Sequence, residues 1–260
     1  MTTKHEDARK IVEHISAGYP ERVLTVYLQP IMDMTNGRCL GAEALVRGLV
    51  EGKVIPPDRF IAELEQNSDI CKVGVYVLQS ALLFAKEHGL HQERHFMLSS
   101  NFSPVEINDR TTVEKIKKVA EACGYPVNKI TIEITETKIP LSAQGRENAR
   151  WLQQNGFVLA WDDISHPDDL NKNGHEFCSN VIKLDRSLLN KESLPLAKEI
   201  IQACKRNKLQ LVAEGVEYLW QREWLLEQDV TTCQGYFYSP PVESRTFAQR
   251  YRYSSEETSH

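Results

Sequence analysis

Short runs rich in β-branched residues alternate with longer amphipathic stretches along most of this 260-residue chain. Such alternation indicates an α/β architecture with a mainly parallel sheet. Two runs, 180–184 and 209–213, are compact and apolar, as expected of buried parallel strands. Eight strand candidates favour a TIM-like (β/α)8 barrel over an open sheet, because that barrel takes about 250 residues. The candidates are 24–33, 38–45, 95–101, 129–135, 157–161, 180–184, 209–213 and 231–234.

Stretches with helical patterning lie between these strand candidates. Thr112 and Ser142 stand where helix N-caps are expected, and Gly124 and Gly156 stand where C-caps belong. The predicted helices are 58–66, 73–87, 112–123, 142–154, 195–205 and 219–228.

The chain reads as one domain with additions at both ends. The first two strand candidates are separated only by Thr35-Asn36-Gly37, so we expect a hairpin that leaves one antiparallel strand near the N-terminus of the barrel. No repeat or low-complexity linker divides the chain. We expect residues 1–19 to form an added helix, 20–250 to form the domain, and 251–260 to be a mobile tail.

Composition excludes several classes of partner. The net charge of −5 and the pI near 5.9 give no electrostatic footprint for a nucleic-acid polymer. The most apolar stretch, 73–85, is shorter than the ~20 residues of a membrane span, and the charged N-terminus is unlike a secretory signal. Six scattered cysteines without a C-x-x-C pair favour reduced thiols. We therefore expect a cytoplasmic protein that binds neither membranes nor nucleic acid.

Polar side chains recur where the strand candidates end. Because the carboxyl ends of parallel barrel strands meet on one face, we expect these side chains to share a cavity. Carboxylates gathered there would repel one another unless cations lay between them, and oxygen ligands favour Mg²⁺ or Mn²⁺ over zinc. Two such ions ~4 Å apart would activate a water for phosphoryl displacement, with a lysine beside them to orient it. The residues are Glu43, Asn101, Glu133, Glu136, Asp162, Asp163, Lys183, Asp185, Glu214, Glu217 and Gln234.

Each of these residues also has an ordinary structural explanation. The chain holds 36 acidic residues, and some will follow strands by chance and cap the next helix. Asp163 could be such a cap, Lys183 and Asp185 could form a surface ion pair, and Gln234 could belong to a turn. The joint pattern, with a polar group at one strand end after another, favours the metal site.

The same residues lie in an ordered series of short motifs. They are Glu43-Ala44-Leu45, Asn101-Phe102-Ser103, Glu133-Ile134-Thr135-Glu136, Asp162-Asp163, Lys183-Leu184-Asp185, Glu214-Gly215-Val216-Glu217 and Gln234-Gly235. In this order, over roughly residues 20–245, the series resembles the EAL phosphodiesterase domain family. The resemblance implies hydrolysis of cyclic di-GMP to linear pGpG. Because the family commonly works as dimers, it also implies a homodimer.

The resemblance further implies two sites for Mg²⁺ or Mn²⁺. Glu43, Asn101, Glu133 and Asp162 would bind the first ion. Asp162, Asp163 and Glu214 would bind the second, so that Asp162 bridges the pair.

Roles in chemistry and substrate binding follow from the same resemblance. Lys183 would contact the attacking water, and the chemistry would also involve Glu43, Asp163 and Glu214. Arg47 would meet a substrate phosphate, Gln29 would lie along the nucleotide, and Gln234 would help to order the solvent at the metals. Three further residues would stabilise the metal ligands without binding the ions themselves. They are Glu136, which would steady the loop after Asp163, and Asp185 and Glu217.

Residues 164–170 depart from the family pattern. The family carries a glycine-rich loop here that is tied to metal binding and dimer coupling, whereas this chain reads Ile-Ser-His-Pro-Asp-Asp-Leu. Both glycines are lost, and Pro167 fixes a backbone angle that glycine leaves free. We expect a stiffer loop near Pro167, with Asp168 and Asp169 facing water and His166 solvated rather than bound to metal.

Two functions remain open beside each other. An active metal-dependent cyclic di-GMP phosphodiesterase is favoured because no proposed metal ligand is replaced. The altered loop instead suits a weak or inactive domain that acts as a cyclic di-GMP receptor or binds a protein partner. A phosphodiesterase for another nucleotide has no support beyond the metal cluster itself.

Overall fold

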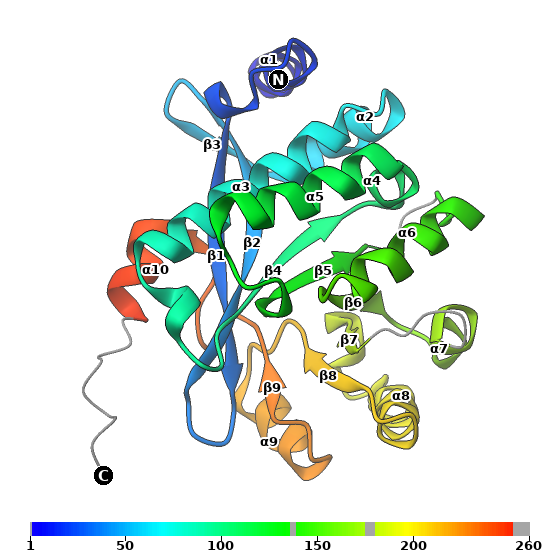
Figure 1. The fold of residues 1–260 in the computed structure, drawn as a ribbon. Helices are drawn as coiled ribbons and strands as arrows, with labels where there is room; N and C mark the ends of the chain where they lie inside the picture. The colour runs from blue at the N-terminus through cyan, green and yellow to red at the C-terminus, as the bar shows by residue number, and fades with distance from the viewer. Residues whose placement is uncertain (1, 136–138, 175–179, 252–260) are drawn as a thin grey trace.

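The chain folds into a closed barrel of eight strands in this computed structural model, which describes residues 2–135, 139–174 and 180–251 (Figure 1). The ring runs in the order β1-β9-β8-β7-β6-β5-β4-β2, and pairing of β1 with β2 closes it. Two short strands, β3 (Lys53–Ile55) and β10 (Val242–Glu243), extend the sheet outside the ring. The predicted (β/α)8 barrel is thus confirmed. The ring strands are β1 (Leu24–Asp33), β2 (Cys39–Val50), β4 (Met97–Phe102), β5 (Ile130–Ile134), β6 (Val158–Ile164), β7 (Val181–Leu184), β8 (Gln210–Ala213) and β9 (Thr232–Cys233).

The antiparallel strand is β1. It pairs antiparallel with both of its ring neighbours, β2 and β9, whereas the other ring pairs are parallel. The hairpin turn depends on Asp33, whose carboxylate accepts hydrogen bonds from Thr35 and Asn36. Gly37 then adopts a φ of +73°, which glycine tolerates without steric cost. The predicted hairpin is confirmed.

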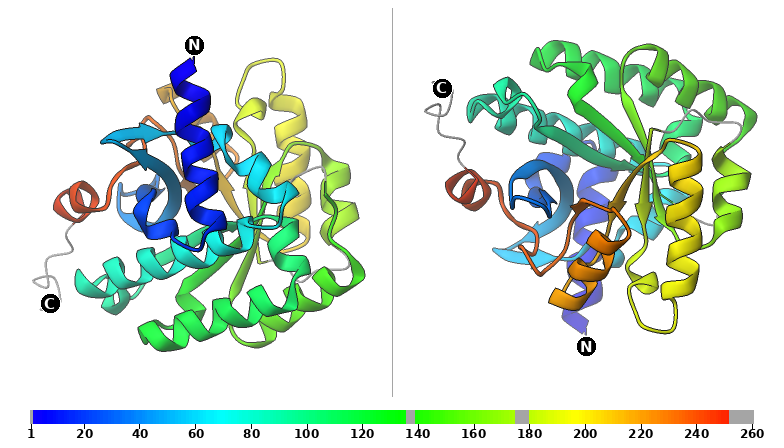
Figure 2. Two further views of the ribbon diagram at one scale, coloured as in Figure 1. Left: turned by 90° about the horizontal axis from the view of Figure 1, so that it is seen from above. Right: turned by 90° about the horizontal axis from the view of Figure 1, so that it is seen from below.

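Helices surround the barrel and cover the outer face of its strands (Figure 2). Helix α1 packs on β2, and its Ile11 and Ile15 side chains are fully buried. No helix in the described part of the chain has the length and apolar character of a membrane span. The helices are α1 (Thr2–Ser16), α2 (Ile61–Gln66), α3 (Ile70–Glu87), α4 (Pro104–Asn108), α5 (Arg110–Cys123), α6 (Ala143–Gln154), α7 (Pro167–Gly174), α8 (Leu194–Arg206), α9 (Leu219–Glu227) and α10 (Ser244–Arg250).

The two faces of a ring strand carry different kinds of side chain. On β5, Ile130, Ile132 and Ile134 belong to the hydrophobic core beneath the helices. The alternate residues, Thr131 and Glu133, point to the inside of the barrel, because successive side chains of a strand lie on opposite faces. The helix layer therefore stabilises the fold, while the inner face of the ring is left to polar groups.

Elements that the sequence did not predict are short. They are β3, β10, α4, α7 and α10, none of which is long enough to display a clear hydrophobic period. Within 164–170 the expected loop is in part a helix, since α7 begins at Pro167. Proline suits the first turn of a helix, where its missing N–H has no partner to lose.

Three of the four predicted helix caps are correct. The Ser142 side chain accepts the backbone N–H of Gly145, and Gly124 and Gly156 adopt positive φ after their helices. Thr112 is not a cap, because α5 begins two residues earlier, at Arg110.

The N-cap of α5 is Asp109. Its carboxylate accepts the backbone N–H groups of Thr111 and Thr112 at 3.1 and 3.0 Å, together with the Thr112 hydroxyl at 2.6 Å. Thr112 is fully buried, so its hydroxyl needs this partner.

We therefore expect Asp109→Ala to lower the free energy of unfolding by about 1 kcal/mol, because the helix loses its N-cap. The control is Asp109→Asn, which keeps an acceptor at the same position and should lose less. Urea denaturation of the three proteins measures the difference. An alanine variant as stable as the parent would contradict this assignment of the cap.

Candidate metal centre and substrate cleft

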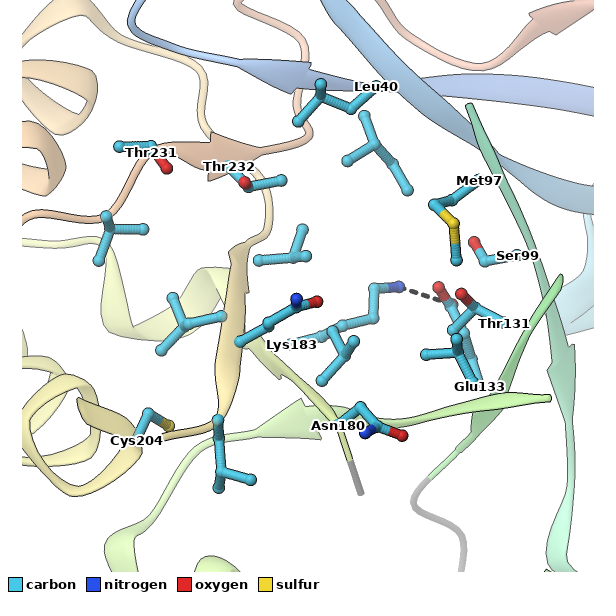
Figure 3. A pocket seen from close by; sticks show the side chains of 18 of the residues that line it. Leu40, Met97, Ser99, Thr131, Glu133, Asn180, Lys183, Cys204, Thr231 and Thr232 are labelled. Carbon is cyan, nitrogen blue, oxygen red and sulfur yellow. Dashed lines mark hydrogen bonds and ion pairs between the residues drawn. The ribbon is translucent and has the colours of Figure 1, made fainter. Parts of the chain in front are cut away.

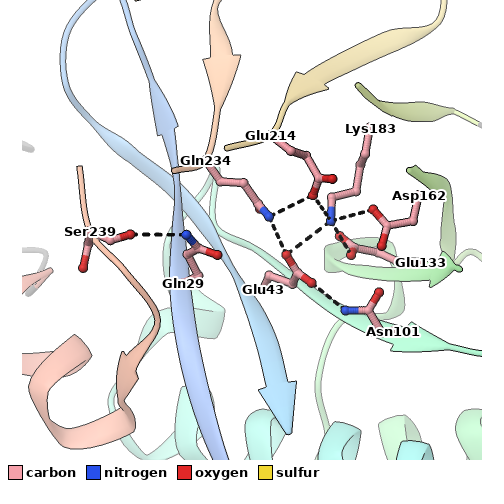
Figure 4. A network of polar contacts seen from close by, with 9 residues as sticks. All are labelled: Gln29, Glu43, Asn101, Glu133, Asp162, Lys183, Glu214, Gln234 and Ser239. Carbon is pink, nitrogen blue, oxygen red and sulfur yellow. Dashed lines mark hydrogen bonds and ion pairs between the residues drawn. The ribbon is translucent and has the colours of Figure 1, made fainter. Parts of the chain in front are cut away.

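A buried lysine stands at the centre of the polar residues inside the barrel (Figure 4). Lys183, on β7, is 1% exposed. Its Nζ lies 2.6 Å from Glu214 Oε1, 2.8 Å from Glu133 Oε2, 3.0 Å from Asp162 Oδ1 and 3.2 Å from Glu43 Oε2. Five strands thus bring one ammonium and four carboxylates together, which excludes a surface ion pair as the role of Lys183.

Two amides complete this cluster. Gln234 Nε2 donates to Glu43 Oε2 at 2.6 Å and to Glu214 Oε1 at 3.0 Å, and Asn101 Nδ2 donates to Glu43 Oε1 at 2.5 Å. Their carbonyl oxygens, Asn101 Oδ1 and Gln234 Oε1, are buried and have no hydrogen-bond partner among the described residues. Because buried oxygens in folded proteins usually have a partner, we expect each of these two to bind a cation or a water.

The protonation of the cluster follows from burial and from its one cation. Burial acts against the charge of Lys183, but the surrounding carboxylates, Glu133 and Glu43 foremost, raise its pKa well above the usual value. Burial also acts to raise the pKa of Glu43, yet the charge of Lys183 and the hydrogen bond from Gln234 outweigh it and lower this pKa. The pair Lys183 and Glu43 is therefore charged.

The other three carboxyls are held less firmly in the charged form. Burial, followed by the charge of Glu43, raises the pKa of Glu133 well above its usual value. Burial raises the pKa of Asp162 and takes that of Glu214 to about 8. One ammonium does not balance four buried carboxylates, so the cluster would gain from additional positive charge.

A second group of oxygen donors begins at Asp162. One oxygen from each of Asp162, Asp163 and Glu214 lies within 4.8 Å of the others. The pairing of β6 with β7 shifts register between Trp161 and Ile164, and Asp163 adopts a φ of +54° within this irregularity. Bulges of this kind redirect side chains next to functional sites. Here the bulge lets both consecutive aspartates reach the same region.

The residues present fit divalent cations of the hard, oxygen-binding type. Every donor in the two groups is a carboxylate or amide oxygen, which suits Mg²⁺ and Mn²⁺. Asn101 Oδ1 has no hydrogen-bond partner among the described residues, and the buried carboxylates outnumber the one ammonium, so both observations are compatible with a bound divalent cation.

A cleft of about 400 Å³ lies against this cluster. Gln29 and Arg47 line it together with Glu43, Asp163 and Glu214. Its far wall comes from the segment around α2 and α3, through Pro57, Ile61, Val73 and Val77. A volume in this range is typical of small-molecule sites, which join apolar walls with a few polar groups.

The two predicted substrate residues take up different positions in the cleft. Gln29 is buried and donates through Nε2 to the Ser239 carbonyl at 3.3 Å. The Arg47 guanidinium lies 5.6 Å from the centre of the Tyr27 ring and donates to the Val46 carbonyl at 2.8 Å. Burial lowers the pKa of Arg47 from its ordinary value, yet an arginine remains charged and can face an anion.

Two of the predicted supporting residues, Asp185 and Glu217, have no described contact with Lys183. Asp185 caps a short 3₁₀ helix by accepting the Ser187 backbone N–H at 2.9 Å. The Glu217 side chain is exposed. Glu136 lies outside the described residues. Position at a strand end therefore did not by itself identify the residues that meet inside the barrel.

The charged side chains of residues 164–170 contact other residues of that segment. The Asp169 carboxylate accepts the backbone N–H of His166 at 2.9 Å, and His166 Nδ1 lies 3.5 Å from Asp168 Oδ2. The side chains of His166 and Asp168 are exposed to 56% and 66%, so both lie in solvent, as predicted. Both aspartates lie in the first turn of α7, where the helix dipole favours negative charge.

Sequence reasoning missed one buried acid in the wall of the cleft. Glu106 is 2% exposed, and burial raises its pKa to about 8. Its Oε2 accepts the Ser103 backbone N–H at 2.8 Å as part of a capping box at the start of α4. The spacing Ser103-x-x-Glu106 was the available signal.

Comparison with known proteins assigns the family. A sequence model of the EAL domain matches residues 15–241, so the chain belongs to the EAL domain family. It is 28% identical over 243 residues to the probable cyclic di-GMP phosphodiesterase PdeB of Escherichia coli K12, and it is 27% identical over 243 residues to the cyclic di-GMP phosphodiesterase RocR of Pseudomonas aeruginosa. The alignments cover 87% and 91% of this chain, but 44% and 62% of those proteins.

Solved structures share the fold. The EAL enzyme Bd1971, in a form bound to cAMP and cyclic di-GMP, superposes with a TM-score of 0.84 at 22% identity. The match covers 96% of this chain and 70% of that one. At this level of identity the likeness confirms the barrel.

The Lys183 cluster makes a direct prediction for the metal-free protein. In EDTA, Lys183→Met should lower the free energy of unfolding by about 3 kcal/mol, because four buried carboxyls lose their cation. Added Mn²⁺ should recover much of this loss by supplying positive charge. Urea denaturation with EDTA or with Mn²⁺ measures both effects.

The control for this prediction is Lys205→Met. Lys205 pairs with Asp229 at 2.7 Å on the surface, with side chains 47% and 85% exposed, so its loss should cost under ~0.5 kcal/mol. If both variants were equally stable in EDTA, or if Mn²⁺ left the Lys183 variant unchanged, the cluster would not work as described.

Proposed function

We propose that this chain hydrolyses cyclic di-GMP to linear pGpG with the help of two divalent metal ions. The observation that carries the proposal is the four-carboxylate cluster around Lys183 at the base of a ligand-sized cleft. Membership of the EAL family supports the substrate, since relatives in that family are named for cyclic di-GMP phosphodiesterase activity. We also propose that the protein acts in the cytoplasm as a homodimer.

The ions are Mg²⁺ or Mn²⁺ in this proposal. Glu43, Asn101, Glu133 and Asp162 would hold the first, and Asp162, Asp163 and Glu214 would hold the second. The unpartnered Asn101 Oδ1 supports the first site, and the mutual approach of three carboxylates within 4.8 Å supports the second. Bound there, two divalent cations would supply an activated water and stabilise charge on the phosphoryl oxygens.

The other side chains of the site would orient the attacking water, hold the carboxylates in place and bind the substrate. The Lys183 ammonium would contact and orient the attacking water, and Gln234, which bonds Glu43 and Glu214, would keep those carboxylates in place. Arg47 would bind a substrate phosphate. Gln29 would lie along the nucleotide.

Three residues that do not bind the ions would stabilise the segments that carry the metal ligands. Asp185 would hold the turn after β7 through its bond to Ser187. Glu136 and Glu217 complete this set. For Glu217, whose side chain is exposed, the described contacts give no support.

A receptor that binds cyclic di-GMP without cleaving it is the second candidate. It is favoured by α7, which begins at Pro167 where the family carries a flexible glycine-rich loop. A helix four residues after Asp163 restricts how this aspartate can adjust when the cleft is filled. The hydrolysis assay separates the two functions.

The experiment is hydrolysis of cyclic di-GMP by the purified protein with Mn²⁺, Mg²⁺ or EDTA, followed by separation of the nucleotides. We expect metal-dependent formation of pGpG. Glu43→Ala and Asp162→Asn should lower turnover by roughly 10²-fold or more, because each removes a group that stabilises charge at the reacting phosphate.

The matched control is Asp168→Asn, which removes an exposed carboxylate from α7 and should leave turnover unchanged. Unchanged turnover in Glu43→Ala or Asp162→Asn, with the fold intact by circular dichroism, would refute the site. Tight binding of intact cyclic di-GMP by the parent protein, without pGpG, would instead establish the receptor.

A further inference from the structure

A second and larger cavity lies beneath the Lys183 cluster, inside the amino-terminal half of the barrel (Figure 3). Its volume is about 910 Å³, within the range of small-molecule sites. It opens between residues that precede or begin the ring strands, among them Arg94, Asn180 and Gln210. This is the face opposite to the one on which barrel enzymes place their catalytic groups.

The cavity exists because one layer of the barrel interior is made of small side chains. Each lies two residues before a member of the polar cluster on the same strand, and so on the same inner face. Barrels of this type usually fill that space with branched residues such as Val, Ile and Leu, whereas three of the five positions here hold Ser or Thr. This small layer consists of Ser99, Thr131, Val181, Val212 and Thr232, all of which line the cavity.

The polar cluster acts as a partition between the two cavities. Glu43, Asp162 and Glu214 line the cleft above, whereas Lys183 and Glu133 line the cavity below. A molecule in the lower cavity would therefore touch the underside of the cluster without entering the cleft proposed for the substrate.

Polar groups converge at the inner end of the lower cavity. Ser99 and Thr131 are register partners on β4 and β5, and Figure 3 shows both hydroxyl-bearing side chains beside Glu133 and Lys183. Ser99 is 2% exposed, and its Oγ has no hydrogen-bond partner among the described residues. A buried hydroxyl of this kind is ready to bond a ligand.

The side chains that line the walls and the inner end of the cavity indicate the polarity and charge of a ligand that would fit there. Ile31, Leu40, Met97 and Val158 give the cavity an aliphatic lining. Lys183 already faces four carboxylates, so its three N–H groups are engaged. An anionic head group would meet the Glu133 carboxyl, and a cationic one would meet the Lys183 ammonium, since both groups line the inner end of the cavity. A hydroxyl can donate to Glu133 and accept from Ser99.

We propose that the lower cavity is a second ligand site, which takes a small neutral molecule with an aliphatic body and a hydroxyl head group. Its occupant lies against Ser99, Thr131 and Glu133, on the far side of the cluster from the cleft. The site goes beyond the proposed hydrolysis and does not depend on it.

Methionine methyl groups offer a direct test. The chain has four methionines, and of the three that the structure describes, Met97 lines the cavity while Met32 and Met34 are buried elsewhere. With ¹³C-methyl methionine, titration with 1-hexanol should shift the Met97 resonance in a saturable way and leave those of Met32 and Met34 in place. Hexanoate and hexylamine, which have the same six-carbon body, should bind at least tenfold more weakly.

Variants locate the binding. Ser99→Ala should weaken 1-hexanol binding about tenfold by removing one hydrogen bond. Its control is Ser100→Ala, because Ser100 Oγ is equally buried and unpartnered among the described residues but does not line the cavity. Val212→Phe should abolish the Met97 shift by filling the space, and Thr232→Leu serves if that variant does not fold.

The outcomes are clear in both directions. An unmoved Met97 resonance, equal effects of Ser99→Ala and Ser100→Ala, or equal binding of all three probes would overturn the proposal. The measurement needs no turnover, so it stands apart from the proposed hydrolysis. A failed hydrolysis assay and a failed titration are therefore distinguishable.

Discussion

The contact of one buried ammonium with four carboxylates is the interaction on which the rest of the barrel interior depends. Lys183 brings β2, β5, β6 and β8 to a common point, with every Nζ to oxygen distance between 2.6 and 3.2 Å. Separately, each buried carboxylate would be costly, and one lysine does not balance four. Contact with Lys183 reduces the cost of burying the carboxylates, yet the cluster still lacks sufficient positive charge. A site for divalent cations has these two properties.

The same arrangement determines what lies above and below it. The polar side chains end their strands at one face, so the cleft with Arg47 and Gln29 opens there. Two residues earlier on the same strands, small side chains leave the lower cavity beneath Lys183 and Glu133. One layer of charge thus separates two ligand-sized spaces. The period of two residues along a strand accounts for both.

Much of this could be predicted from the sequence, because the ring strands are compact apolar runs and their polar ends are regular. Strand β1 was predicted to the residue, since a turn at Gly37 and a change of pattern mark its ends. The α5 cap at Asp109 and the helix at Pro167 escaped prediction, because each depends on contacts that apolar periodicity does not display. Glu217 follows a strand as Glu214 does, and only the three-dimensional structure shows that the Glu217 side chain is exposed. The bulge that turns Asp163 toward Asp162 has no sequence signal of its own.

The central claim is that the carboxylates around Lys183 are metal ligands rather than a purely structural ion cluster. Anomalous diffraction from crystals grown with Mn²⁺ tests it most directly, because it locates the ions without reference to turnover. The account predicts two peaks, one beside Asn101 Oδ1 and Glu43 and one beside Asp163 and Glu214, with Asp162 between them. Crystals in which the barrel interior shows no peak at saturating Mn²⁺, with Lys183 still in contact with all four carboxylates, would contradict it.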